Sequence, residues 1–267
     1  MVVQQIGGYV ETRAIYREIF DDDVYLQGGI TLPEGGTVVD VGANIGMFVL
    51  RLLSAKKHLS ILALEPVPAL FAALQANVDA HKTPADSVRL FNLAGGDKDG
   101  AAAFQFYPRA TAFSTMFPEE RHRLEPWLLD DLLTHYPAFR KRFPVVGFLL
   151  YPFRRTLMKL IIKRRMANPQ LVQCVVQPLT RVFDETNTTT VDLLKSDVEG
   201  AELSVLRGIE GRHWQMIRQV ALEVQDLDGR LDEILALLKQ QSFSVVEVVP
   251  DVGTDPSAQV RLVYARR

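Results

Sequence analysis

Cysteine is almost absent from the sequence, since Cys174 is the only one among 267 residues. A single thiol excludes an internal disulfide and fits a reducing compartment. Long apolar runs are also missing: no stretch of about twenty uncharged apolar residues occurs, so no membrane-spanning helix is expected. The first residues lack a basic region followed by an apolar run, which predicts no signal peptide. We therefore expect a soluble, cytoplasmic protein.

A strong overall charge is lacking as well. The formal net charge is -2, so the chain as a whole is not expected to bind nucleic acid. The charge is nevertheless unevenly distributed, because no aspartate or glutamate occurs from Leu132 through Phe183. Nine lysines and arginines lie between residues 140 and 165. This local basic region calls for an explanation of its own.

The usual signatures of metal and nucleophile sites are absent too. Histidine and cysteine do not occur at the spacing of metal ligands, so no metal site is predicted, although clustered carboxylates can hold Mg²⁺ without a sequence signature. No Ser-His-Asp or Cys-His arrangement is indicated by position either. The chemistry has to be sought in acidic and glycine-containing segments.

One such segment is the stretch Thr37 to Gly46, which reads TVVDVGANIG. A short apolar run ends in an acid, two glycines follow, and residues 47–53 read as the start of a helix. Glycines allow a ligand to approach the backbone closely, and a helix N-terminus offers unpaired N–H groups. This strand, glycine turn and helix are typical of an α/β protein that binds a nucleotide-like ligand.

An acid at the tip of the second predicted strand narrows the ligand. Residues 61–64 form an apolar strand that ends in Glu65 and Pro66, roughly twenty residues after the glycine turn. A carboxylate at this position accepts hydrogen bonds from the two hydroxyls of a ribose. The alternative role of Glu65 is to cap the next helix, predicted from Pro68 to Ala80.

The remaining pattern predicts an α/β fold with a Rossmann-like sheet of alternating strands and helices. A third strand, residues 88–92, leads into small residues beside Asn92 and Ala94. Residues 101–107 and 174–179 read as further strands, the latter an edge strand because of Pro178. The stretch 191–202 opens from a strand into a helix, and residues 243–249 and 260–265 predict a C-terminal antiparallel hairpin.

Residues 108–170 interrupt this rhythm and predict a helical lid or substrate-recognition insertion. Helices are expected over 119–135 and 153–166, and residues 1–30 are expected to form a helical cover within the single domain 1–267. On the second helix Phe153, Leu157, Leu160 and Ile161 share one face. Three interpretations remain open: a solvated basic face over a packed apolar stripe, a dock for an acidic protein or a phosphorylated substrate, or a membrane-surface helix.

Acidic residues also follow the strand at 191–196. Asp197 and Glu199 lie at its C-terminal tip, where open α/β sheets place ligands. If the strand geometry persists, the two side chains point the same way and one carboxylate raises the pKa of the other. Alternatively, Asp197 binds the cofactor and Glu199 caps the following helix.

Several motifs together resemble one family. The loop VDVGANIG resembles the S-adenosylmethionine loop of class I methyltransferases, and it lacks the third glycine of a dinucleotide loop. The chain is more closely similar to the FkbM family, in the branch associated with polyketide and nonribosomal peptide synthesis. The stretches that carry this resemblance are Val38–Gly46, Leu64–Pro66, Ala94–Gly100 and Leu193–Gly208, the last reading LLKSDVEGAELSVLRG.

The resemblance implies a seven-stranded sheet, S-adenosylmethionine as cofactor and O-methylation of a natural-product hydroxyl. The loop residues Asp40, Gly42, Asn44 and Gly46 would bind the methionine part, or Asp40 would fix the loop. Further donor-binding positions would be Glu65 and Pro66 at the ribose, Asn92 and Ala94 at the adenine, and Asp197 at the methionine end.

An acceptor hydroxyl must also lose its proton, and the candidates for catalysis are Asp197, Glu199, Glu223 and the position of Gln225. Relatives often carry histidine where this chain has Gln225, and an amide cannot act as a general base as imidazole does. The expected partners are a small-molecule acceptor and an acidic carrier protein docked on the basic insertion, with peripheral membrane contact left open. Alternatives are an N- or C-methyltransferase and a non-catalytic S-adenosylmethionine-binding protein.

Overall fold

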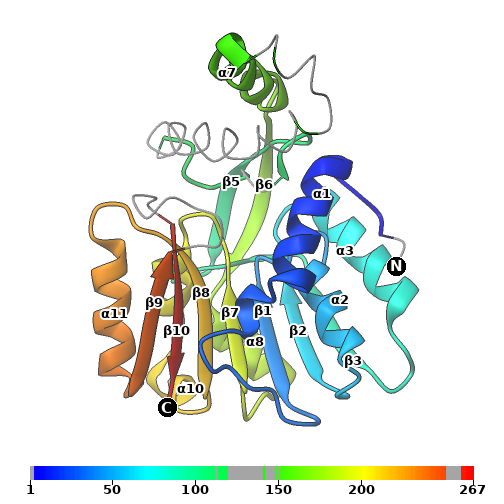
Figure 1. The fold of residues 1–267 in the computed structure, drawn as a ribbon. Helices are drawn as coiled ribbons and strands as arrows, with labels where there is room; N and C mark the ends of the chain where they lie inside the picture. The colour runs from blue at the N-terminus through cyan, green and yellow to red at the C-terminus, as the bar shows by residue number, and fades with distance from the viewer. Residues whose placement is uncertain (1–2, 112–113, 120–140, 142–147, 149–150, 251–259) are drawn as a thin grey trace.

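The computed structural model describes residues 3–111, 114–119, 141, 148, 151–250 and 260–267 (Figure 1). Its centre is a seven-stranded sheet in the order β3-β2-β1-β7-β8-β10-β9. The strands from β3 to β8 pair in parallel, whereas β10 is antiparallel to both β8 and β9. The strands are β1 (Thr37–Val41), β2 (Ser60–Leu64), β3 (Ser87–Phe91), β7 (Leu193–Ser196), β8 (Gln219–Gln225), β9 (Val245–Pro250) and β10 (Val260–Arg266). The predicted fold class and its antiparallel C-terminal strands are confirmed.

Strand periodicity divides the core into two layers. Neighbouring residues of a strand point to opposite faces of a sheet, so a strand that is apolar at every position is buried on both sides. Val38 and Leu193 pack into one hydrophobic cluster, and Val39 and Leu194 pack into the other. Helices α2 (Met47–Ser54) and α3 (Pro68–His81) belong to the first cluster. The second contains α8 (Leu179–Thr186), α9 (Glu202–Arg207), Trp214 of α10 (Gly211–Trp214) and α11 (Arg230–Gln240).

The N-terminal segment lies beside the sheet and is anchored to its last strand in sequence. It consists of α1 (Tyr9–Tyr16), a π-helical turn (Arg17–Asp21) and a 3-10 turn (Val24–Leu26). The Tyr264 hydroxyl of β10 donates a hydrogen bond to the Val24 carbonyl at 2.6 Å. Arg266 of the same strand donates to the Gly29 carbonyl at 3.2 Å. Two segments far apart in the sequence thus support each other.

A second, three-stranded sheet has the order β4-β6-β5, with β4 (Ala94–Gly95), β5 (Gly100–Phe106) and β6 (Gln170–Gln177). The prediction of an edge strand at residues 174–179 was wrong, because β6 is the central strand of this sheet. Pro178 lies just after the strand, at the N-cap of α8. A proline there removes no N–H from the sheet, so it does not restrict β6 to an edge.

The predicted insertion is described only in part. Helix α7 (Arg154–Arg165), preceded by a 3-10 turn (Tyr151–Phe153), stands beyond β5 and β6 at the top of Figure 1. The helix expected over residues 119–135 lies outside the described residues, apart from Glu119. Of the four apolar residues expected to pack on the second helix, Phe153, Leu160 and Ile161 are exposed, at 63%, 61% and 38%, and Leu157 is half-buried, so none of them is buried. The interpretation of a packed apolar stripe was therefore wrong.

No helix in the described part of the chain is long and apolar enough to cross a membrane.

Close packing at Gly208 joins the end of α9 to the second sheet, and this contact is testable. A Cβ at Gly208 would overlap the Gly96 carbonyl oxygen next to β4 and lie 3.2 Å from Pro178 Cα. We predict that Gly208→Ala lowers the free energy of unfolding by about 1–3 kcal/mol, because backbone atoms cannot yield as a flexible side chain does. Urea denaturation of the purified protein measures this change.

Gly211→Ala is the matched control, because a Cβ at Gly211 has no atom within 4 Å. Its free energy of unfolding should stay within about 0.5 kcal/mol of the unchanged protein. Equal stability of both variants would contradict the close approach at Gly208.

Candidate active site

The glycine loop folds tightly at the carboxyl end of β1. Gly42 and Gly46 have φ values of 80° and 87°, and Asn44 has a φ of 50°. The Gly42 and Ala43 N–H groups both donate to the Leu64 carbonyl, at 3.0 and 2.9 Å. A Cβ at Gly42 would overlap the Asp197 carbonyl oxygen. Positive φ and this overlap together require glycine at position 42.

Glu65 closes the same end of the sheet, and its side chain is only 4% exposed. One carboxylate oxygen accepts a hydrogen bond from the Asn44 N–H and the other from the Val67 N–H, each at 2.9 Å. Burial raises the pKa of Glu65 to about 7, and these two hydrogen bonds oppose the shift. Each oxygen keeps further acceptor capacity for a ligand.

Asn92 and Pro66 complete this turn. The Asn92 amide donates to the carbonyls of Glu65 and Pro66, at 2.9 and 3.0 Å. Pro66 and Ala94 line the cavity, whereas Asn92 is not among its lining residues. Asn92 therefore stabilises the backbone of the turn and does not line the cavity.

Lys195 and Asp40 form a buried ion pair below the loop. They are direct partners on the neighbouring strands β7 and β1, and the Lys195 Nζ atom lies 3.0 Å from Asp40 Oδ1. Lys195 also donates to the Gly42 carbonyl at 3.0 Å. Burial disfavours the charged form of Lys195, but Asp40 and Asp197 outweigh it and raise its pKa. Asp40 is fully buried and does not line the cavity, so its contact with the loop passes through Lys195.

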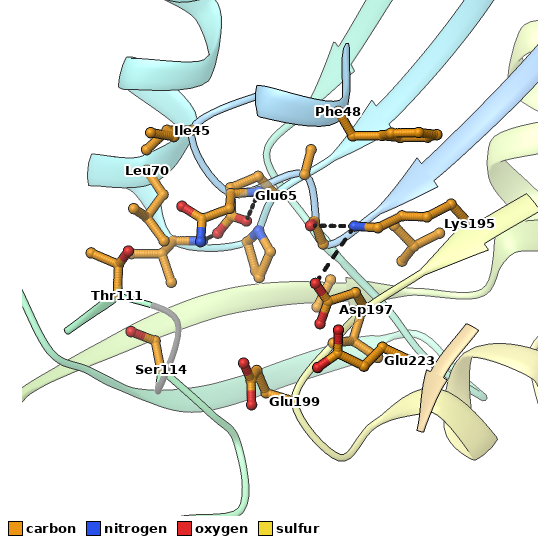
Figure 2. Close-up of a pocket in the computed structure, with 18 of the residues that line it drawn as sticks. Ile45, Phe48, Glu65, Leu70, Thr111, Ser114, Lys195, Asp197, Glu199 and Glu223 are labelled. Atoms are coloured by element: carbon orange, nitrogen blue, oxygen red, sulfur yellow. Dashed lines mark hydrogen bonds and ion pairs between the residues drawn. The ribbon is translucent and has the colours of Figure 1, made fainter. Parts of the chain in front are cut away.

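Two carboxylates meet at the tips of β7 and β8. The Tyr25 hydroxyl lies 3.0 Å from Asp197 Oδ2 and 3.2 Å from Glu223 Oε2. Lys195 Nζ lies 3.9 Å from the same Asp197 oxygen. Figure 2 shows Asp197 and Glu223 next to each other, with Glu65 farther along the same cavity.

Glu199 reaches this cavity by a different route from the one expected. The strand ends at Ser196, and Glu199 has a φ of 52°, so the strand geometry does not persist through residue 199. Thr115 fixes this conformation by donating to the Glu199 carbonyl at 2.8 Å. The Gln225 amide donates to the Glu199 carboxylate at 2.6 Å, while Gln225 itself is not a lining residue. Gln225 thus orients a carboxylate.

Tyr25 and Lys195 line the cavity but were not among the predicted site residues. A local signal for Lys195 existed, because a charged residue interrupts the apolar run of β7. Tyr25 lies in the N-terminal segment that was expected to cover the sheet, where a core role was favoured over a ligand contact, and its contact with Asp197 spans 172 residues of sequence. The structure adds both to the loop, Glu65, Asp197, Glu199 and Glu223.

Known proteins align with almost the whole chain. The "31-O-demethyl-FK506 methyltransferase FkbM" of Streptomyces tacrolimicus is 35% identical over 260 residues, which cover 96% of this chain and 90% of that protein. The chain belongs to the FkbM methyltransferase family. The protein-family model described as "Methyltransferase FkbM domain" matches residues 159–245 of the chain. "Methyltransferase 1" of Beauveria bassiana is 30% identical and covers 97% of this chain and 91% of its own.

A longer relative contains a similar segment. The "AMB antimetabolite synthetase AmbE" of Pseudomonas aeruginosa is 31% identical over 240 residues, which cover 88% of this chain but only 11% of the synthetase. The predicted resemblance to FkbM proteins and the link to natural-product biosynthesis are confirmed by these matches.

S-adenosylmethionine is the cofactor of this FkbM methyltransferase, and the cavity fits it. The loop between Gly42 and Gly46 is bare backbone, and the adjacent Glu65 carboxylate has capacity for ribose hydroxyls. The Asn44 Oδ1 atom is buried in the cavity wall without a hydrogen-bond partner among the described residues. A buried polar atom of this kind requires a partner that a ligand can supply. Among the described residues, no group of three or more histidine, cysteine, aspartate or glutamate side chains is arranged so that it could hold a metal ion.

The pKa of Glu65 leads to a prediction about donor-site binding. We propose that the ribose hydroxyls donate to the ionised Glu65 carboxylate, so that binding requires deprotonation of a group whose pKa is about 7. The affinity for the ligand is then highest above this pKa and falls as the pH drops through it. We expect S-adenosylhomocysteine to bind about tenfold more weakly at about pH 6 than at about pH 8. Calorimetric titration measures the affinity at each pH.

Glu65→Gln should weaken binding at the higher pH and remove this dependence. Glu202→Gln is the matched control, because burial also raises the pKa of Glu202 to about 7 but Glu202 does not line the cavity. An unchanged pH dependence in Glu65→Gln would contradict the ribose-binding role.

Proposed function

We propose that the protein transfers a methyl group from S-adenosylmethionine to a hydroxyl oxygen of a natural-product intermediate. The observation that carries this proposal is the meeting of Asp197, Glu199 and Glu223 in the cavity that also contains the glycine loop and Glu65. A hydroxyl has to lose a proton when it accepts a methyl group, and a carboxylate positioned beside it can take that proton.

The donor end holds and orients the cofactor in this proposal. The backbone of the loop from Gly42 to Gly46 receives the methionine part, with the Asn44 side chain in the wall. Glu65 accepts hydrogen bonds from the ribose, and Pro66 and Ala94 border the adenine. Asp40 acts indirectly, because it fixes Lys195 and Lys195 fixes the Gly42 carbonyl.

Catalysis then consists largely of alignment. S-adenosylmethionine supplies a methyl group already activated by its sulfonium. Bound there, it would give this methyl group to the acceptor oxygen and keep the electron pair of the broken carbon–sulfur bond on sulfur. Asp197 or Glu223 takes the hydroxyl proton, and Glu199, oriented by Gln225, borders the acceptor. The chain therefore has carboxylates for the role that histidine would fill at position 225.

The name of the Streptomyces relative supports transfer to oxygen, since it describes a methyltransferase of a 31-O-demethyl compound. N- and C-methylation use the same donor site and differ in the acceptor. Incubation of the protein with deuterium-labelled S-adenosylmethionine and a panel of hydroxyl, amine and carbon acceptors, followed by mass spectrometry, identifies the methylated atom. Labelling of an amine or carbon alone would contradict the proposal.

Charge removal at the carboxylates tests their role. In Asp197→Asn and Glu223→Gln we expect donor binding to persist while kcat falls by about 10²–10⁴ for the residue that takes the proton. Steady-state turnover assays measure kcat, and calorimetric titration of S-adenosylhomocysteine measures donor binding, so the two effects are separated. Glu34→Gln is the matched control, because this exposed glutamate does not line the cavity.

Unchanged turnover in both Asp197→Asn and Glu223→Gln would show that neither carboxylate is the base. Full donor binding without turnover on any acceptor, in the unchanged protein as well, would instead favour a non-catalytic S-adenosylmethionine-binding protein.

We further propose that α7 docks an acidic carrier protein that presents the acceptor. Six lysines and arginines occur within its twelve residues, without an acid, and exposed Phe153 and Leu160 lie among them. Carrier proteins are typically acidic, so their charge complements this helix. The similarity to a segment of a synthetase agrees with an acceptor held on such an assembly.

Charge reversal on α7 tests the dock. The triple variant R154E/R155E/K159E should lower kcat/KM for a carrier-bound acceptor by about 10-fold or more and leave a free acceptor unaffected. The matched control reverses the exposed Lys56, Arg89 and Lys239 on the body of the protein. Equal loss on both acceptors would contradict docking, and binding of α7 to anionic lipid vesicles but not to the carrier would favour the membrane interpretation.

A further inference from the structure

One buried amide is bonded to two separate stretches of chain near the cavity. Asn77 of α3 is 2% exposed, and its side chain makes three hydrogen bonds to backbone groups. The amide nitrogen donates to the Ile45 carbonyl at 2.8 Å and to the Gln4 carbonyl at 3.1 Å. The amide oxygen accepts from the Gln4 N–H at 2.6 Å. An amide that uses both of its N–H groups and its oxygen in this way fixes the groups around it.

The Ile45 carbonyl belongs to the glycine loop. Asn44 and Gly46, on either side of it, both have positive φ, and the Gly46 N–H donates to the Ala43 carbonyl at 2.8 Å. Further hydrogen bonds tie the loop to the end of β2 and to β7, whereas the bond to Ile45 comes from a helix. Asn77 thus holds the part of the loop next to the cavity-lining Asn44.

Gln4 leads into the N-terminal segment, which forms another part of the cavity wall. The chain begins near α3 and continues into α1 through Gly7 and Gly8, whose φ values are 89° and 97° (Figure 1). Four residues of the segment line the cavity, namely Ile15, Glu18, Ile19 and Tyr25. The amide that holds the glycine loop therefore also holds the start of a second wall.

Side chains from elsewhere fix the rest of the segment. The Thr111 hydroxyl, in the cavity wall, donates to the Glu11 carboxylate at 2.7 Å. At the far end the Tyr264 hydroxyl donates to the Val24 carbonyl. A cofactor that fills the cavity contacts the loop and the segment together. Its affinity then depends on both walls being in place at the same time.

We propose that Asn77 is a positioning residue for the cofactor, which holds the glycine loop and the N-terminal segment in one arrangement that bound S-adenosylmethionine stabilises. A ligand that contacts two walls favours the state in which both are in place. By linkage, a bond that holds the walls together raises the affinity for the ligand by the same factor. The inference concerns the cofactor, so it goes beyond the proposed function and does not depend on which atom accepts the methyl group.

Hydrogen–deuterium exchange followed by mass spectrometry tests this coupling, with S-adenosylhomocysteine as the probe. In the unchanged protein the probe should slow amide exchange about tenfold in residues 9–25 as well as in the glycine loop. An unaltered exchange rate in residues 9–25 would overturn the assignment.

Asn77→Leu keeps the branched shape of the side chain and removes its three hydrogen bonds. We expect this variant to bind the probe about tenfold more weakly in calorimetric titration and to lose most of the protection of residues 9–25. A residue with only a structural role would lower stability without changing either measurement. Lower stability with unchanged affinity and unchanged protection would therefore overturn the assignment.

Gln4→Pro examines the same coupling from the other partner and replaces Asn77→Leu if that variant does not fold. Proline removes the Gln4 N–H at an exposed position and leaves the bond from Asn77 to Ile45 in place. We expect about fivefold weaker binding of the probe. Gln5→Pro is the matched control, because Gln5 is also exposed and its N–H has no hydrogen-bond partner in the described part of the chain. Equal affinities of the two proline variants would overturn the assignment.

A double-mutant cycle shows whether the coupling passes through Asn77. Gln4→Pro should weaken binding no further in the Asn77→Leu background, because the acceptor of the Gln4 N–H is already absent. Additive losses would overturn the assignment. None of these measurements requires an acceptor. Failure of methyl transfer to a hydroxyl would therefore contradict the proposed function alone, and unchanged affinity in the variants would contradict the role of Asn77 alone.

Discussion

The ion pair between Asp40 and Lys195 governs the geometry of the cavity. Burying two opposite charges is costly unless they are paired and further hydrogen-bonded, and removal of one partner leaves an uncompensated charge in the core. The two residues are direct neighbours on β1 and β7, and the same ammonium contacts the Gly42 carbonyl and approaches Asp197. Consequently the glycine loop and the acid at the tip of the next strand are not placed independently. A single buried cation sets the distance between the donor end and the proposed acceptor end.

The charge balance around that cation suits the cofactor. Glu18, Glu65, Asp197, Glu199 and Glu223 line the cavity together with Lys195. At low effective dielectric this excess of carboxylates attracts a cation and repels an anionic group. S-adenosylmethionine brings a sulfonium into the cavity, whereas the basic helix α7 lies well away from the sheet (Figure 1). The negative charge of the cavity and the positive charge of α7 thus lie in different parts of the molecule.

Local patterns in the sequence predicted much of the fold and several of the residues that line the cavity. Each of these predictions depends on only a few neighbouring residues: the apolar run before Asp40, the glycines at 42 and 46, and Glu65 at the tip of a strand. The prediction failed where one local sequence pattern is compatible with two different structures. Pro178 indicated an edge strand, but it lies after β6 as a helix cap. The direction of Glu199 depends on a left-handed backbone conformation, and the contact of Tyr25 with Asp197 joins residues far apart in the chain; no short motif encodes either.

The anchoring of the N-terminal segment on β10 has a consequence for the order in which the protein matures. The Val24 carbonyl receives its hydrogen bond from Tyr264, 240 residues later. On a ribosome, β1, the glycine loop and Glu65 emerge early, and Asp197 and Glu223 follow. The segment that carries Tyr25 obtains its support only when the last strand has been synthesised and has inserted between β8 and β9. The cavity is therefore completed only after β10 has been synthesised, and a nascent chain has the glycine loop before it has the wall that encloses it.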